Sequence, residues 1–148
     1  MFASIVVGTD GSDTATEAVR QAIALARAVG ARIELVSAYE PVPESRLREE
    51  SVHAPHEDLH WMVNAREDVL ATLASAAGEI REAGIDVEVF ARQGDPADAI
   101  LDVAEERGSD LIVVGNEGMT GAKRFLLGSV PNKVSHHAPC SVLIIRTL

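Results

Sequence analysis

Strand-like runs alternate along this chain with segments of helical hydrophobic period. The strand-like runs are SIVVGT, RIELVSAY, DVEVFA, DLIVVG and SVLIIR, at residues 4–9, 32–39, 86–91, 110–115 and 141–146. Several are nearly continuous in Val, Ile and Leu, which is typical of parallel strands covered on both faces. The segments between them place apolar residues at the i, i+3, i+4 spacing of amphipathic helices, as in Ala15, Ala18, Val19, Ala22, Ile23 and Ala26. Further helical segments are predicted over residues 59–80 and 97–104, and a last one follows residue 128.

Helix ends are also marked in the sequence. A glycine follows three of the helical segments, where a left-handed C-cap needs a residue without a Cβ: Gly30, Gly84 and Gly108. Thr14 and Glu17 have the spacing of a capping box at the start of the first helix. Asp95 before Pro96 predicts an N-cap followed by proline at the first helical position.

Strict alternation of strand and helix favours an α/β fold, an open doubly wound parallel sheet with right-handed crossovers. Five strands are too few for a closed eight-stranded barrel, and about four helices flank the sheet. The 148 residues, 47% of them apolar, suit one domain over residues 1–148. Residues 40–56 hold three prolines without a clear period and are predicted to form a long surface loop.

Charge and cysteine content limit the possible functions. The net charge of −10 argues against binding of nucleic acid or an anionic membrane, which requires clustered Lys and Arg. Charged residues interrupt every apolar run before it reaches the roughly 20 residues of a membrane-spanning helix. A single cysteine, Cys140, and the lack of a leader-like start lead us to expect a reducing cytoplasm.

One locally basic segment stands out in this acidic chain: GNEGMTGAKRFLLGS, residues 115–129. In doubly wound sheets, ligands bind beyond the carboxyl ends of the strands. The first and fourth strands end in VVGTDGS and VVGNEGMTG, and these two glycine turns face each other if the strands are neighbours. Glycines leading into a helix start form an anion site, with Ser129 as a predicted cap and Pro131 in the first turn. Phosphate is therefore the expected ligand.

Two common phosphate motifs do not fit. A P-loop needs Lys followed by Ser or Thr directly after its last glycine, but Ala122 separates Gly121 from Lys123, and Arg124 follows. The dinucleotide fingerprint needs three spaced glycines after the first strand, where only Gly8 and Gly11 stand.

The spacing that is present is Gly115-x2-Gly118-x9-Gly128-Ser129. This pattern after the fourth strand resembles that of the universal stress protein family. The resemblance extends along the chain through VVGTDGS, GDPADAI, DLIVVGNEG, LLGSV and HHAPCSVLIIR, which stand in the family's order. The family often has Pro before the Val of the fifth strand, where this chain has Ser141.

The resemblance implies the strand order 3-2-1-4-5, a homodimer through the last strand and, with this glycine pattern, binding of ATP with or without Mg²⁺ or Mn²⁺. By position, Asp10 would contact the ribose and the backbone of Ala38 would meet adenine, while Thr9 would line the same pocket. The residues implied to receive the phosphates are Gly115, Gly118, Gly128, Ser129 and Val130.

Plainer interpretations remain beside these. Asp10 also suits a cap of the first helix, although Ser12, Asp13 and Thr14 supply caps already, and the glycines could be ordinary turn residues. Lys123 and Arg124 fit either a phosphate contact or a solvated pair. The spacing of His53, His56 and His60 suits metal ligands, but Pro55 interrupts that helix face, so we expect no metal. His136 and His137 suit a helix C-terminus or an interface, and Cys140 a small apolar position.

Three functions fit the sequence. The first is an ATP-binding stress-response regulator whose nucleotide changes a surface read by an unidentified protein partner, through the 40–56 or the 115–128 loop. The second is a slow ATPase or autophosphorylating enzyme, although only Asp10, Glu117, Lys123 and Arg124 offer charged groups near the site. The third is a dimeric interaction protein that binds no nucleotide. The intact glycines favour the first two.

Overall fold

The computed structural model describes residues 1–39, 56–117 and 127–147. Its strands are β1 (Ser4–Gly8), β2 (Arg32–Tyr39), β3 (Val87–Gln93), β4 (Leu111–Gly115) and β5 (Ser141–Ile145). Its helices are α1 (Asp13–Val29), α3 (His56–Glu82), α4 (Pro96–Arg107) and α5 (Ser129–His137). The predicted alternation of strand and helix is confirmed, with strand bounds that differ from the sequence-based ones by at most two residues.

The strands form one five-stranded sheet in the order β3-β2-β1-β4-β5, and every pairing is parallel. β1 lies at the centre, where Gly8 pairs with Val36 of β2 and Val7 with Val113 of β4. The expected doubly wound order is therefore confirmed. Because β1 and β4 are neighbours, the two glycine turns that follow them leave the same edge of the sheet side by side.

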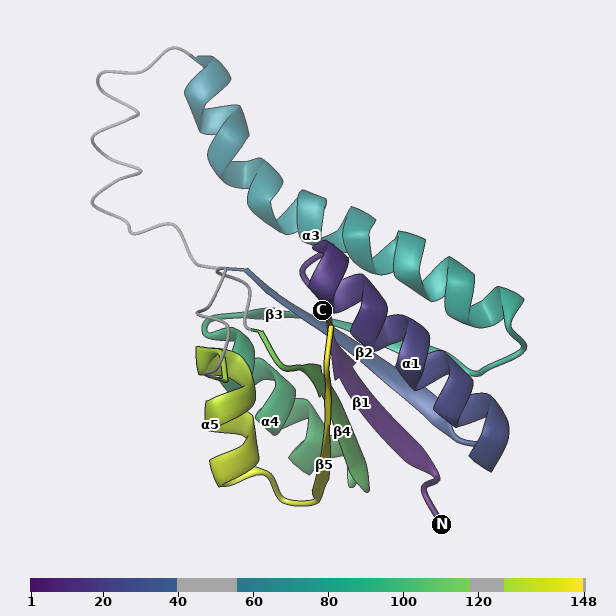
Figure 1. Ribbon diagram of the computed structural model, residues 1–148. Helices are drawn as coiled ribbons and strands as arrows, with labels where there is room; N and C mark the ends of the chain where they lie inside the picture. Colours follow the sequence, from purple (N-terminus) through teal and green to yellow (C-terminus); the bar gives the residue numbers. More distant parts are fainter. Residues whose placement is uncertain (40–55, 118–126, 148) are drawn as a thin grey trace.

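The helices cover the sheet on both faces: α1 and α3 lie on one side, α4 and α5 on the other (Figure 1). Ile5, Val7 and Val113 point toward α1 and α3, whereas Val6 and Ile112 point toward α4 and α5. This two-sided burial explains why the central strands read as continuous apolar runs rather than as alternating ones. Within the described residues, no helix is both long and apolar enough to cross a membrane.

Most of the predicted helix ends are confirmed. Gly30, Gly84 and Gly108 have φ of 73°, 79° and 60°, the left-handed conformation expected after each helix. Asp95 accepts a hydrogen bond from the N–H of Asp98 and caps α4, and Pro96 is its first residue.

Two predicted caps are wrong by one or two residues. The N-cap of α1 is Ser12, whose Oγ accepts a hydrogen bond from the N–H of Ala15, and not Thr14. The reason is Gly11, whose φ of 81° turns the chain just before Ser12 and so starts the helix earlier. The cap position of α5 is Gly128, and Ser129 is already its first helical residue.

A polar cluster is buried toward the amino ends of the strands. Glu34 of β2 is fully buried, and its carboxylate accepts hydrogen bonds from Ser4 Oγ and Arg32 Nε, both at 2.7 Å. Ser4 Oγ also lies 3.2 Å from the hydroxyl of Ser109. The carboxylate of Asp110 accepts from the N–H groups of Ala3 and Ser4 at 2.9 and 3.1 Å. These groups satisfy one another and tie β1, β2 and β4 together.

Candidate functional site at the carboxyl edge of the sheet

The turns after β1 and β4 meet at a narrow cavity between the first turns of α1 and α5. Its lining includes Gly8, Ser12, Thr14, Gly115, Glu117, Val130 and Pro131. A Cβ added at Gly115 would lie 3.3 Å from Thr147 Cγ2, a tight contact, and at an ordinary 3.7 Å from the carbonyl oxygen of Thr14 in α1. The free volume is about 30 Å³, room for one small group. A larger ligand would have to extend along the edge of the sheet outside this cavity.

The first turn of α5 presents unpaired backbone donors to this cavity. Gly128 has no side chain to cap the helix, and no side-chain cap hydrogen bond is formed there within the described residues. The N–H groups of Ser129 and Val130 have no intrahelical acceptor at this position, and Pro131 has no N–H at all. Ser129 is exposed, so its hydroxyl is also accessible. The arrangement is suited to an anion, because N–H dipoles and the helix dipole both favour negative charge.

Asn116 organises the base of the glycine-rich segment. Its side-chain oxygen accepts hydrogen bonds from the N–H and the hydroxyl of Thr147, both at 2.9 Å. Its carbonyl accepts from the N–H of Gly128 at 3.1 Å, and its N–H donates to Ile145. One residue thus joins the end of β4 to the end of β5 and to the start of α5. No sequence signal marked Asn116 for this role, although it stands inside the glycine motif.

Asp10 lies in an Asx turn directly after β1. Its Oδ1 accepts a hydrogen bond from the N–H of Ser12 at 2.9 Å, so this carboxylate shapes the turn and does not cap α1. The side chain is exposed, and its second oxygen makes no hydrogen bond to any described residue. That oxygen is free to accept hydrogen bonds from a ligand.

The main chain of Ala38 is open on one side. In a parallel sheet, alternate residues of a middle strand direct their N–H and C=O to opposite neighbours. The carbonyl of Val36 accepts from the N–H of Thr9 on the β1 side, and that of Tyr39 accepts from Gly94 on the β3 side. Ala38 therefore directs its N–H and C=O to the β1 side, where β1 has already ended. One donor and one acceptor face the space above the Asp10 turn.

Thr9 does not line the cavity beside Gly115. Its side chain is buried on the opposite side of the turn, toward α3, and Gly8 faces the cavity between α1 and α5 instead. Gly118, Lys123 and Arg124 lie outside the described residues, as do the 40–55 segment and the side chains of His53, His56 and His60. Their predicted roles stay predictions.

Cys140 is remote from this edge. It precedes β5 at the amino end of the strand and packs against the apolar cluster under α4 and α5. Burial raises the pKa of its thiol, and the charge of Asp110 adds to the effect. A half-buried, neutral thiol agrees with the small apolar role expected from the sequence.

A doubly wound parallel sheet with two glycine turns and two helix N-termini at its carboxyl edge defines a class of α/β proteins that bind ligands at that edge. The sequence profile of the universal stress protein family matches residues 1–146. The chain therefore belongs to the universal stress protein family.

Related sequences and solved structures agree with this family membership. A universal stress protein of Thermus aquaticus is 40% identical over 146 residues, which cover 99% of this chain and all of that protein. A universal stress protein crystallised in complex with cAMP is 32% identical, with a TM-score of 0.72 and coverage of 99% and 98% of the two chains. One from Archaeoglobus fulgidus in complex with dAMP is 26% identical, with a TM-score of 0.67 and 98% of both chains covered.

Proposed function

We propose that this protein is an adenine-nucleotide-binding regulator, with ATP as its ligand. The observation that carries the proposal is the convergence of two helix N-termini, those of α1 and α5, on one glycine-lined cavity. Two such termini provide a positive potential and free N–H donors where phosphates would lie. The complexes of two relatives with cAMP and dAMP support an adenine nucleotide as the ligand.

The polar groups along the edge suit the parts of a nucleotide in order. The open N–H and C=O of Ala38 match the acceptor N1 and the donor N6 amino group of adenine. The free carboxylate oxygen of Asp10 suits the ribose hydroxyls, since carboxylates accept short, strong hydrogen bonds from hydroxyl groups. The phosphates would then reach Gly115, Ser129 and Val130, and Gly118 through its position in the motif.

Glu117 argues for a cation beside the phosphates. Glu117 is one of the residues that line the cavity, and a triphosphate close to its carboxylate would be repelled without a compensating charge. Mg²⁺ or Mn²⁺ bound to the phosphates would supply that charge, because both prefer carboxylate and phosphate oxygens. We therefore expect the affinity for ATP to depend on the divalent cation more strongly than the affinity for AMP.

The chemistry of the edge suits binding better than turnover. Phosphoryl transfer normally requires a positioned base and cations around the transferring phosphate. Among the described residues, the lining of the cavity between α1 and α5 includes a single acidic residue, Glu117, and no basic residue. We propose that ATP occupancy changes the conformation of the segments beside the site and so controls a protein partner.

The outer edge of β5 suits a second copy of the chain. β5 is an edge strand, and Leu143 is 39% exposed on it. Exposed apolar edges in native proteins are normally covered, and a homodimer through β5 would do so. Sedimentation analysis should find a dimer for the wild type and a monomer for Leu143→Lys. A wild-type monomer at micromolar concentration would contradict this part of the proposal.

Calorimetric titration tests nucleotide binding most sharply with three variants of the β1–α1 turn. Asp10→Asn keeps an oxygen that can accept from the N–H of Ser12, but it removes the charge offered to the ribose. Asp10→Ala removes both. Asp13→Asn, at the first position of α1, is the matched control. ATP, AMP and cAMP are each titrated with and without Mg²⁺, and phosphate release is measured in parallel.

We expect wild type and Asp13→Asn to bind ATP equally, Asp10→Asn to bind roughly tenfold more weakly, and Asp10→Ala more weakly still. Phosphate release should stay slow compared with the median enzyme rate of about 10 per second. If none of the three adenine nucleotides gave a heat of binding, the proposed function would be refuted. Equal affinity of all four proteins would refute the assignment of Asp10 alone.

A further inference from the structure

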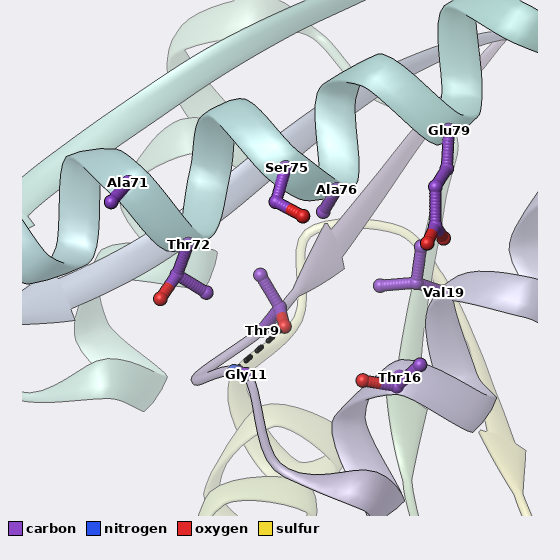
Figure 2. A pocket seen from close by; sticks show the side chains of 9 residues that line it. All are labelled: Thr9, Gly11, Thr16, Val19, Ala71, Thr72, Ser75, Ala76 and Glu79. Carbon is purple, nitrogen blue, oxygen red and sulfur yellow. Dashed lines mark hydrogen bonds between the residues drawn. The ribbon is translucent and has the colours of Figure 1, made fainter.

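A second cavity lies on the other side of the β1–α1 turn, between α1 and α3 (Figure 2). Its volume is about 400 Å³, within the range of small-molecule sites. Residues of the turn alternate between the two cavities: Gly8 and Ser12 line the one beside β4, whereas Thr9 and Gly11 line this one. An occupant here would therefore be distinct from a nucleotide at the carboxyl edge.

The α3 wall of this cavity is polar where a helix–helix contact is normally apolar. Thr72, Ser75 and Glu79 occupy one stripe of α3 and turn their side chains toward α1 (Figure 2). The neighbouring stripe of α3, with Leu73, Ala77 and Ile80, is fully buried in the core. Ser75 and Glu79 are exposed and Thr72 is half-buried, so this polar stripe lines the cavity and is accessible from solvent.

These polar groups have no hydrogen-bond partner in the part of the chain that the structure describes. No described residue makes a hydrogen bond with the hydroxyls of Thr16, Thr72 or Ser75 or with the carboxylate of Glu79. Thr9 is only 2% exposed; its Oγ1 accepts from the N–H of Gly11, but its own O–H finds no acceptor among the described residues. A buried donor without an acceptor costs free energy, so an occupant that accepts from Thr9 would be stabilised.

The lining selects a chemical class. Among the described residues no cationic side chain lines the cavity, and Glu79 is negative, so phosphates and carboxylates find no countercharge there. A protonated amine would suit Glu79 but offers no acceptor to Thr9. A hydroxyl group both donates and accepts hydrogen bonds, so a polyhydroxylated molecule can accept from Thr9 and donate to Glu79. Its C–H groups can pack against Val19 and the alanine side chains of the lining. We propose that the cavity between α1 and α3 binds a small neutral polyol, such as a sugar or a cyclitol.

NMR titration of the nucleotide-free protein with myo-inositol tests this proposal independently of nucleotide binding. Saturating shifts of the amides of Gly11, Thr72 and Ser75 are expected, with an affinity on the order of millimolar, because the cavity is open to solvent. Ser75→Leu fills the cavity and should abolish the saturating shifts. Ala74→Leu adds the same side chain at the preceding position of α3, which is exposed like Ser75 but lies outside the lining, and should leave them unchanged.

Glu79→Gln keeps the shape of the cavity and should weaken the binding of myo-inositol roughly threefold to tenfold, while Glu82→Gln on the same helix should not. Spermidine and inorganic phosphate are titrated in parallel. The proposal is overturned if myo-inositol gives no saturating shift, if Ser75→Leu and Ala74→Leu behave alike, or if spermidine binds more tightly than myo-inositol.

Discussion

The two ends of the sheet use similar polar residues in opposite ways. At the amino ends, Glu34 and Asp110 are satisfied by Ser4, Arg32 and main-chain N–H groups of the same cluster. At the carboxyl ends, the main chain of Ala38, the first turn of α5 and one oxygen of Asp10 have no partner among the described residues. The amino end is thus complete by itself, whereas the carboxyl end leaves donors and acceptors open to the nucleotide that we propose.

This difference separates stability from binding in one small protein. A satisfied buried network holds strands together, because removing one member leaves the others without partners. Open donors and acceptors contribute little to folding, but they are already positioned to receive a ligand. Substitutions at the amino end should therefore change the free energy of unfolding, and substitutions at the carboxyl end should change the dissociation constant of the nucleotide.

The largest expected effect is that of Glu34→Ala at the amino end. The variant loses the hydrogen bonds from Ser4 and Arg32 and leaves a cavity in the buried cluster. We expect the free energy of unfolding in urea to fall by about 2–4 kcal/mol. The affinity of the folded protein for ATP should not change. If the free energy of unfolding fell by less than about 1 kcal/mol, the range of solvent-exposed ion pairs, the cluster would not hold the strands together.

Asn116 at the carboxyl end should affect both quantities. Asn116→Ala removes the acceptor of two hydrogen bonds from Thr147 and should lower the free energy of unfolding by about 1–2 kcal/mol. It should also weaken ATP binding, since the base of the glycine-rich segment loosens. Asn116→Asp keeps the acceptor but adds a negative charge beside the phosphates. For Asn116→Asp, urea unfolding should therefore show near-normal stability, and calorimetry should show weaker ATP binding. Normal ATP binding by this variant would place the phosphates elsewhere.

The smallest effect is a pH dependence at the amino end. The hydrogen bond from the N–H of Ala3, joined by that from Ser4, holds the pKa of Asp110 below its usual value, although desolvation opposes the shift. Because the folded pKa lies below the unfolded one of about 3.9, this contribution is complete above that pH and is lost as the pH falls through the folded pKa.

Asp110→Asn should therefore lower stability near neutral pH by less than about 1 kcal/mol and reduce the loss of stability on acidification, as followed by urea unfolding between about pH 6 and pH 2. Asp102→Asn, which replaces an exposed acid of α4, is the control. An acid-induced loss in Asp110→Asn equal to that of the wild type would contradict the assignment.

The order of the elements was predictable because burial on both faces leaves continuous apolar strands, and helix period and C-cap glycines mark what lies between. The start of α1 was not predictable in the same way. Ser12, Asp13 and Thr14 all suit a cap, and the choice depends on the left-handed backbone of Gly11. The burial of Glu34 was also hidden, since Ser4, which donates to it, is 30 residues away in sequence, and Ser109 pairs with Ser4 across 105 residues.

At the site, the meeting of the two glycine turns was predicted from the motif and the strand order, and it is confirmed. The side of the β1–α1 turn that Thr9 faces was not predicted, because beyond the end of a strand the direction of a side chain depends on local backbone angles. The role of Asn116 could not be read either, since its side-chain partner Thr147 is 31 residues distant in sequence. Long-range pairing of this kind leaves no local pattern.

Amide hydrogen exchange by NMR, with and without saturating ATP and Mg²⁺, tests directly whether the carboxyl edge is the part of the protein that a nucleotide completes. The account predicts slower exchange at Ala38, Ser129 and Val130 on ATP addition, and unchanged exchange at Ala3 and Ser4, whose N–H groups are already bonded to Asp110. Unchanged exchange at all three carboxyl-edge amides in an ATP-bound protein, or protection confined to the amino end, would contradict it.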